Sequence, residues 1–175
     1  MPQLSVVVPV HNERDNIVPL IEEIVAALRG RLALEIVYVD DGSPDGSGAV
    51  ARELAAADPR VVLVELSRNF GHHPAAVAGL AHARGRRVFI LDVDLEEQPE
   101  WLAGFAGQMD ASAADVVYGI SRVRKGTLLR RAFGAMFWKL FNALSDVAVP
   151  ENPCTVRIMI RRYVDALLTL PDRNL

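Results

Sequence analysis

The stretch Val88-Phe89-Ile90-Leu91-Asp92-Val93-Asp94-Leu95-Glu96 is an apolar run that leads directly into acidic residues. Because the run is rich in β-branched and aromatic residues, it predicts a buried strand of a parallel sheet. Asp92 and Asp94 stand two positions apart, and alternate residues of an extended chain point to the same face. Their carboxylates would repel each other unless a cation lay between them. Such oxygen ligands favour Mg²⁺ or Mn²⁺, with open coordination positions for a diphosphate.

A simpler interpretation of the same stretch is that Asp92 and Asp94 only end the strand and cap the following helix. A pair of acids at this spacing does not separate the two interpretations. The polar residues that follow the other predicted strands do.

Size and charge limit the classes of protein to consider. A chain of 175 residues with 51% hydrophobic residues is long enough for one globular domain. Its net charge of −3 gives no support for a nucleic-acid partner, and we expect none. The single Cys154 excludes an internal disulfide and suits a reducing compartment, although its simplest role is that of a small buried hydrophobe. The N-terminus lacks the pattern of a secretory signal, and no apolar run is long enough to span a bilayer.

Strand patterns alternate with helical patterns along the chain. We predict strands at 4–10, 34–39, 61–66, 88–91, 115–119 and 155–160, and helices at 17–28, 47–57, 74–84, from about 100, at 128–144 and at 163–170. This alternation predicts an α/β fold whose mostly parallel sheet is flanked by helices. In such sheets, ligands bind beyond the carboxyl ends of the strands.

Four polar loops are expected to meet at that edge. They are the turn at 11–13, the acidic turn at 40–41, the loop at 67–73 and the acidic stretch at 92–96. Each follows a different predicted strand. Their convergence favours a ligand site over four unrelated turns.

The predicted helix at 128–144 is too apolar for a single buried stripe, and it follows a basic turn at 121–126. An aromatic helix flanked by arginines suits the surface of a membrane. Packing against a part of the protein that lies outside this chain would explain it equally well. The sequence stops abruptly after the last helical pattern, so we expect further C-terminal segments.

Four motifs occur in order, each at the end of a predicted strand: Val8-Pro9-Val10-His11-Asn12-Glu13, Val39-Asp40-Asp41-Gly42-Ser43, Ser67-Arg68-Asn69-Phe70-Gly71-His72 and Asp92-Val93-Asp94-Leu95. Together they resemble the family 2 glycosyltransferases of the Rossmann-like GT-A fold, especially those that act on polyprenyl phosphates, such as dolichol-phosphate mannose synthases and bactoprenol glucosyltransferases. The similarity covers nearly the whole chain. It implies one GT-A catalytic domain over residues 1–175, cut before amphipathic or transmembrane helices.

The resemblance also implies roles for particular residues. The nucleotide-sugar would be bound by Pro9, His11, Glu13, Val39, Asp41, Arg68, Asp92, Val93 and Asp94. Asp92 and Asp94 would be catalytic and would hold Mg²⁺ or Mn²⁺, with Glu96 beside them. The phosphate or the acceptor would be bound by Arg122, Arg124, Arg131 and Arg157.

Three positions depart from the family pattern. Glu96 replaces a frequent Gln and would add negative charge near the metal, and His11 replaces a frequent Tyr. Cys154-Thr155-Val156-Arg157 stands where the look-alikes often have Gly-Asp-Phe-Arg, so Thr155 replaces a proposed acid. A sugar hydroxyl needs a base to become a nucleophile, whereas a phosphate monoester is already an anion at neutral pH. The loss of that acid therefore favours a phosphate acceptor, and Glu151 is the remaining candidate for a base.

The sequence thus predicts a metal-dependent, inverting hexosyltransferase that moves a sugar from a nucleotide-sugar to a polyprenyl phosphate. We expect it at the cytoplasmic face of the membrane, in cell-envelope assembly, with a homo-oligomer possible. Two alternatives stay open: a family 2 enzyme with a sugar hydroxyl acceptor, and a nucleotide-sugar-binding module without turnover. A nucleotidyltransferase would need a Gly-rich loop after the first strand, and the segment from Pro9 to Glu13 contains no glycine.

Overall fold

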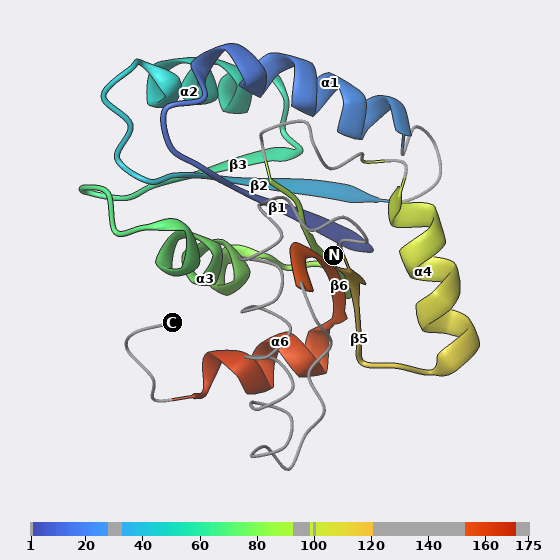
Figure 1. The fold of residues 1–175 in the computed structure, drawn as a ribbon. Helices are drawn as coiled ribbons and strands as arrows, with labels where there is room; N and C mark the ends of the chain where they lie inside the picture. The colour runs from blue at the N-terminus through green and yellow to red at the C-terminus, as the bar shows by residue number, and fades with distance from the viewer. Residues whose placement is uncertain (1, 28–32, 93–98, 100, 121–152, 171–175) are drawn as a thin grey trace, which may run out of the picture.

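The computed structural model describes residues 2–27, 33–92, 99, 101–120 and 153–170. Strands and helices alternate in this part of the chain as the sequence predicts (Figure 1). The strands are β1 (Leu4–Val10), β2 (Leu34–Asp40), β3 (Val61–Glu65), β4 (Arg87–Ile90), β5 (Val116–Ile120) and β6 (Pro153–Ile160). The helices are α1 (Ile17–Ala27), preceded by a short 3₁₀ turn η1 (Arg14–Asn16), α2 (Ser47–Ala57), α3 (His72–His82), α4 (Trp101–Ser112) and α6 (Arg161–Leu168). The predicted α/β class is confirmed.

One six-stranded sheet forms the centre, with the strand order β3-β2-β1-β4-β6-β5. The first four strands in sequence are parallel, and β6 runs antiparallel to both β4 and β5. The prediction of a mostly parallel sheet is therefore confirmed. The sequence did not reveal the antiparallel strand, because β6 has the same apolar pattern in either direction.

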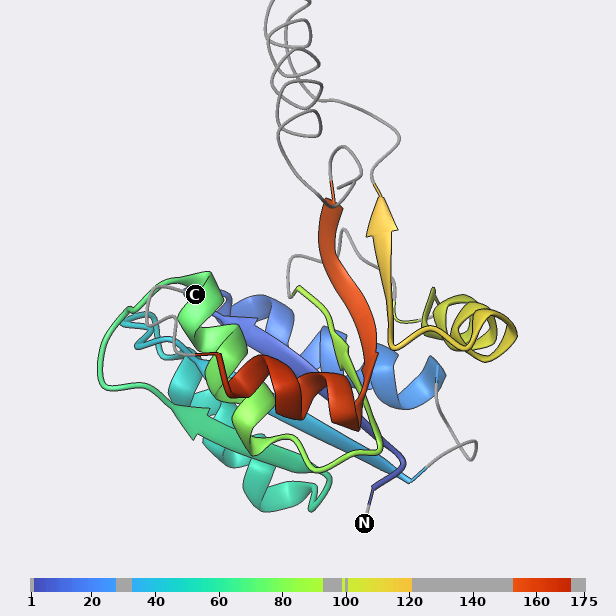
Figure 2. The same ribbon diagram turned by 90° about the horizontal axis from the view of Figure 1, so that it is seen from below.

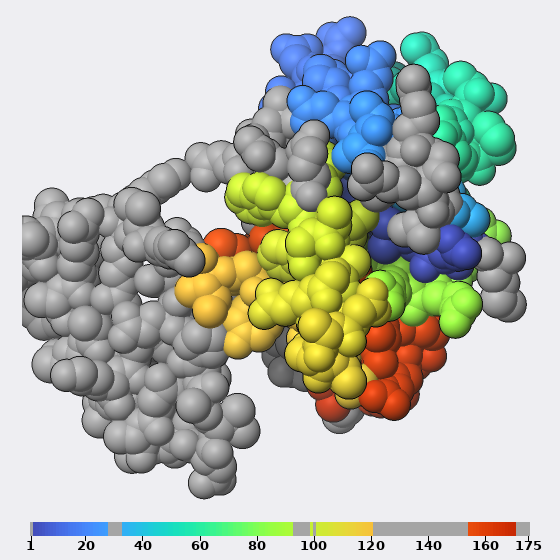
Figure 3. Space-filling view, turned by 90° about the vertical axis from the view of Figure 1, so that its right-hand side faces the viewer, coloured from blue at the N-terminus to red at the C-terminus, as the bar shows by residue number. Residues whose placement is uncertain are grey.

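Helices cover both faces of the sheet. One core contains α1, α2 and α4 packed on side chains such as Tyr38 and Phe89. The other contains α3 and α6 packed on Val7, Val39 and Met159. Figures 1 and 2 show α1 and α2 on one side of the sheet and α3 and α6 on the other. In the space-filling view, α4 lies between α1 and α6 (Figure 3). This three-layer arrangement explains why β1 and β2 are buried on both faces.

Element boundaries differ from the prediction by only a few residues. Helix α3 begins two residues earlier than expected, so Pro74 is its third residue, a position that needs no backbone N–H donor. Strand β6 begins two residues earlier than expected. The predicted helix at 128–144 lies outside the described residues. Within the described ranges, no helix combines the length and apolar character needed to cross a bilayer.

Candidate functional site

Asp41 joins the loops after β1, β2 and β3 at the carboxyl edge of the sheet, through its side chain and its backbone. Asp41 is only 2% exposed. Its carboxylate accepts hydrogen bonds from the backbone N–H of Phe70 (2.7 Å) and of Gly71 (2.8 Å), and its own N–H donates to the carbonyl of Val10 (2.8 Å). Bonds to a buried carboxylate are among the stronger hydrogen bonds in proteins. Asp41 therefore holds the three loops together, a structural role beside its predicted contact with the donor.

Asp40 and Gly42 complete the tight turn after β2. Asp40 accepts a bond from the N–H of Ser43 (3.0 Å), and its carbonyl accepts one from Leu66 (2.9 Å). Gly42 has φ +64°, and a Cβ there would lie 2.5 Å from the carbonyl carbon of Arg68. Only glycine allows this close approach, which places the loop after β2 directly against the backbone of the loop after β3.

His11 has a fixed tautomer in the turn after β1. Its Nδ1 lies 2.9 Å from the carbonyl oxygen of Asp41, which can only accept, so Nδ1 carries the proton. Its Nε2 lies 3.1 Å from the side-chain amide of Asn12. Asn12 itself has φ +60° and donates its N–H to Ser43 Oγ (3.1 Å). The two contacts hold the ring in place, as a surface for a planar base requires.

Two acids brace the same turn. Asp45 accepts bonds from the N–H of Arg14 (3.1 Å) and from the hydroxyl of Ser47 (2.6 Å). Its slight burial raises the pKa of Asp45, but the hydrogen bonds from Ser47 and Arg14 outweigh this effect, so the pKa lies below its ordinary value. Glu13 is half-buried and accepts a bond from Asn16 (2.7 Å). Asp45 thus links the loop after β2 to the turn after β1, and Glu13 orders that turn from within.

Arg68 and Phe70 form the outer surface of the loop after β3. The guanidinium carbon of Arg68 lies 4.2 Å from the centre of the Phe70 ring, a cation–π contact. The ring is 43% exposed although it is aromatic. Sequence reasoning assigned Arg68 to the donor and gave Phe70 no role. An exposed aromatic beside a cation in a polar loop was the signal for it.

Asp92 follows β4 at the same edge. Its side chain is 28% exposed, and Oδ1 lies 3.6 Å from Nε2 of His72, the first residue of α3. Hard carboxylate oxygen fits Mg²⁺ or Mn²⁺, but Asp92 is the one predicted metal ligand that the structure describes. Val93, Asp94 and Glu96 lie outside the described residues. Among the residues that are described, no three His, Cys, Asp or Glu side chains are grouped to hold a metal ion.

A cavity of about 320 Å³ lies between α3 and α6, and we call it the α3–α6 pocket. It is lined by His72, His73, Ala76, Val77, Leu80, Ile90, Thr155, Arg157, Met159, Tyr163 and Leu167. His72 thus contacts Asp92 on one side and lines this pocket on the other. Arg157, predicted from the sequence to bind the acceptor, and Thr155, which replaces a proposed acid, are therefore close to the predicted donor site. Arg122, Arg124, Arg131 and Glu151 lie outside the described residues, so their roles stay predictions.

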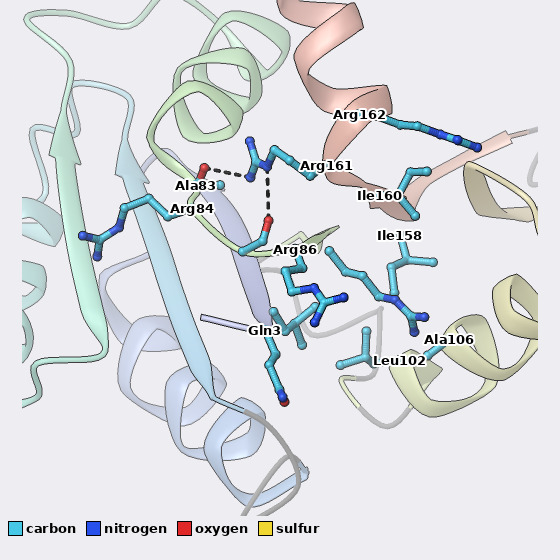
Figure 4. Close-up of a pocket in the computed structure, with 13 residues that line it drawn as sticks. Gln3, Ala83, Arg84, Arg86, Leu102, Ala106, Ile158, Ile160, Arg161 and Arg162 are labelled. Atoms are coloured by element: carbon cyan, nitrogen blue, oxygen red, sulfur yellow. Dashed lines mark hydrogen bonds between the residues drawn. The ribbon is translucent and has the colours of Figure 1, made fainter. Parts of the chain in front are cut away.

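A larger cavity of about 960 Å³ lies at the opposite, amino edge of the sheet and is rich in arginine (Figure 4). Its charges are largely neutralised. Arg87 pairs with Asp110, and Arg162 pairs with Asp115. Arg161 donates to the carbonyls of Ala83 (2.8 Å) and Gly85 (3.1 Å). These bonds fasten α6 to the connection between α3 and β4, which is a structural role.

Next to this cavity, Glu35 is 3% exposed in β2 and accepts bonds from Ser5 Oγ (2.6 Å), from the backbone N–H of Arg84 (2.8 Å) and from Arg84 Nε (2.7 Å). Burial raises the pKa of Glu35, but the bonds from Ser5 and Arg84 outweigh burial, so the pKa lies below its ordinary value. Sequence reasoning did not single out this network. The signal was a polar residue at the second position of each of two apolar strands that pair in register.

The fold and the sequence agree on the class of protein. The sequence model described as "Glycosyl transferase family 2" matches residues 5–168. The chain belongs to this family of glycosyltransferases, as the motifs predicted. A Mycobacterium tuberculosis (strain CDC 1551 / Oshkosh) protein named "Putative glycosyltransferases" is 43% identical over 142 residues, 81% of this chain and 42% of that protein. The bactoprenol glucosyl transferase of Shigella phage SfV is 36% identical over 175 residues, 99% of this chain and 57% of that protein.

Solved structures show the same fold. The mannosyltransferase PcManGT from Pyrobaculum calidifontis, solved with GDP-Man and Mn²⁺, matches with a TM-score of 0.66 and 25% identity, over 95% of this chain and 46% of that one. The S. aureus TarS fragment 1–349 with UDP-GlcNAc matches with a TM-score of 0.56 and 24% identity, over 72% of this chain and 36% of that one, which is a likeness of fold alone. The chain spans about half the length of the curated relatives it matches.

Proposed function

We propose that the protein transfers a sugar from a nucleotide-sugar to a polyprenyl phosphate, with inversion at the anomeric carbon. The observation that carries this proposal is the meeting of the loops after β1, β2 and β3 with Asp92 at one sheet edge, because parallel sheets bind ligands there. The bactoprenol glucosyl transferase relatives support the lipid acceptor by their names, and the mannosyltransferase solved with GDP-Man and Mn²⁺ supports the donor class.

In this proposal the loops bind the nucleoside. His11 offers its ring to the base, Glu13 accepts a bond from a base N–H or a ribose hydroxyl, and the Arg68–Phe70 pair borders the same space. Pro9 and Val39, at the ends of their buried strands, shape the floor. Asp41 keeps the loops together, so it affects the affinity even where it does not touch the donor.

Asp92, with Asp94 and Glu96, would hold Mg²⁺ or Mn²⁺. The cation, when bound, neutralises the departing diphosphate, a form of electrostatic stabilisation that commonly dominates catalysis. An oxygen of the acceptor phosphate forms the new bond to the anomeric carbon. The bond from that carbon to the nucleoside diphosphate breaks, and its electron pair leaves with the diphosphate. No proton has to be removed from the nucleophile, which fits Thr155 in place of an acid. Arg157 would hold the incoming anion.

Two experiments test this function. Calorimetric titration with UDP, GDP and dTDP, each with and without Mn²⁺, should find metal-dependent binding of one of them. That nucleotide then selects the labelled sugar donor for transfer assays with undecaprenyl phosphate and with sugar acceptors. Transfer only to sugar hydroxyls would favour the polysaccharide alternative, and nucleotide binding without any transfer would favour a binding module. Transfer to the lipid phosphate also implies action at a membrane surface, where we expect the cytoplasmic face.

A further inference from the structure

The α3–α6 pocket has two chemically different parts. Its interior is built from buried apolar side chains of the α3–α6 core, including Leu80 (2% exposed), Ile90 (5%) and Met159 (0%). Its polar lining consists of the rings of His72 and His73 with the side chains of Thr155, Arg157 and Tyr163. At about 320 Å³ the cavity is at the small end of the range for small-molecule sites, roughly 300–1,000 Å³.

The polar part of the pocket favours an anion. Arg157 is half-buried and its Nε donates to the carbonyl of Thr155 (2.9 Å), which fixes the direction of the guanidinium. No carboxylate in the described part of the chain pairs with Arg157, and none of the described lining residues is acidic. The arginines of the amino-edge cavity differ in this respect, since most of them have acidic partners. Helix α3 also begins here, at His72, so its positive end adds to the field.

The apolar part of the pocket does not favour a sugar. Leu80, Ile90 and Met159 offer no hydrogen-bond donors or oxygen acceptors, so a hexose placed among them would leave buried hydroxyls unpaired. A bare phosphate would satisfy Arg157 but would leave the apolar cavity unfilled. The occupant that matches both parts is an anionic head joined directly to a branched hydrocarbon.

We propose that the α3–α6 pocket binds the first isoprene units of a polyprenyl phosphate, with the phosphate held by Arg157 at the polar end. This inference rests on the proposed function and places its acceptor. His72 borders both the pocket and Asp92, so a phosphate held there would lie beside the predicted diphosphate site. The pocket would then select a prenyl chain at its phosphate end, independently of any membrane anchor elsewhere in the protein.

Binding of water-soluble phosphate esters to the full chain tests this inference, with geranyl phosphate as the prenyl probe and ethyl phosphate as the head-group probe. Each buried methylene adds about fourfold in affinity, so we expect geranyl phosphate to bind at least about tenfold more tightly. Ala76→Phe fills the cavity and should remove this advantage, while Ala81→Phe, on the exposed side of the same helix, should keep it. Arg157→Gln should weaken both esters.

A gentler variant keeps the test decisive if Ala76→Phe does not fold. Val77→Thr keeps the side-chain shape and places one hydroxyl in the apolar wall, so part of the prenyl advantage should disappear. Equal affinities for the two esters, or a prenyl advantage that survives both pocket variants, would overturn the inference. The inference would also be overturned by a pocket variant that binds geranyl phosphate as well as wild type but has lost affinity for the nucleotide-sugar and not for the nucleoside diphosphate, because the pocket would then hold the sugar. Failure of the proposed function would appear separately, as absence of metal-dependent nucleoside diphosphate binding.

Discussion

The two edges of the central sheet are both rich in charge, but they use it differently. At the amino edge, most charged side chains neutralise one another: Glu35 accepts from Arg84, Arg87 pairs with Asp110, and Arg162 pairs with Asp115. At the carboxyl edge, Asp40 and Asp41 instead accept bonds from backbone N–H groups of the loops, and Arg157 has no acidic partner among the described residues. Charged residues alone therefore do not mark a site. An edge whose loops are fixed while a cation stays unneutralised is suited to an anionic ligand.

The largest expected effect is that of Asp92→Asn at the carboxyl edge. Removing a charge that helps to neutralise the metal–diphosphate group should lower the turnover by about 10²–10³-fold and weaken metal-dependent nucleotide binding. Steady-state transfer assays and titration with Mn²⁺ measure both effects. Asp94→Ala should behave in the same way. Full activity of these variants would show that the active site does not lie at the carboxyl edge of the sheet.

Asp41→Asn should separate loop architecture from direct ligand contact. The Asn amide group would face a backbone N–H of Phe70 or Gly71, so one charge-assisted bond becomes a clash of two donors. We expect a loss of about 2–3 kcal/mol in the free energy of unfolding, measured by urea denaturation, together with weaker nucleotide binding. Asp15→Asn, an exposed acid in the neighbouring turn, is the matched control. Unchanged stability would show that Asp41 does not hold the loops.

Glu35→Gln should lower stability without affecting the site. We expect the free energy of unfolding to fall by about 1–3 kcal/mol. The loss should be smaller than that for breaking a fully buried ion pair, because the Arg84 side chain is 69% exposed. The pKa of Glu35 is lowered in the folded protein, so its stabilisation is complete above the unfolded value of about 4.3 and disappears as the pH falls through the folded value.

Urea unfolding of the wild type and of Glu35→Gln from pH 7 to pH 3 measures how this stabilisation depends on pH. The difference between their free energies of unfolding should be constant down to about pH 5 and should then become smaller. Nucleotide affinity at pH 7 should not change. A gap that widens in acid would contradict the hydrogen-bonded, ionised carboxylate.

Thr155→Asp tests the character of the acceptor. The new carboxylate would stand beside Arg157 in the α3–α6 pocket and repel a phosphate dianion, so affinity for geranyl phosphate should fall about tenfold. Thr155→Asn is the uncharged control of similar shape and should bind nearly as well as wild type. If Thr155→Asp instead increased transfer to sugar hydroxyls, this result would support the alternative of a family 2 enzyme with a sugar hydroxyl acceptor.

Asp110→Asn should have the smallest effect. The Arg87–Asp110 pair is exposed on the acid side (62%), and pairs of this kind contribute about 0–1 kcal/mol. Thermal unfolding should shift only slightly, and transfer activity should not change. A substantial loss of activity would show that the amino edge does more than stabilise the fold.

Local patterns in the sequence were sufficient for the elements and for the loops that follow them. The apolar runs at 4–10 and 34–39 and the polar segments after the strands placed the predicted site at one edge of the sheet. The family match confirms the predicted class of protein. These features depend on neighbours along the chain, where side-chain period and turn residues carry the information.

Contacts between distant segments were decided only by the tertiary structure. The sequence could not show that Asp41 accepts hydrogen bonds from the N–H groups of Phe70 and Gly71. It could not show that Glu35 accepts hydrogen bonds from Ser5 and Arg84, or that β6 lies antiparallel to β4 in the sheet. It also could not show that α3 and α6 enclose a pocket around Arg157. The physical reason is that the apolar pattern of a strand does not depend on the direction in which it runs or on the strand with which it pairs. A buried carboxylate or a cavity, in contrast, exists only once several segments have packed together.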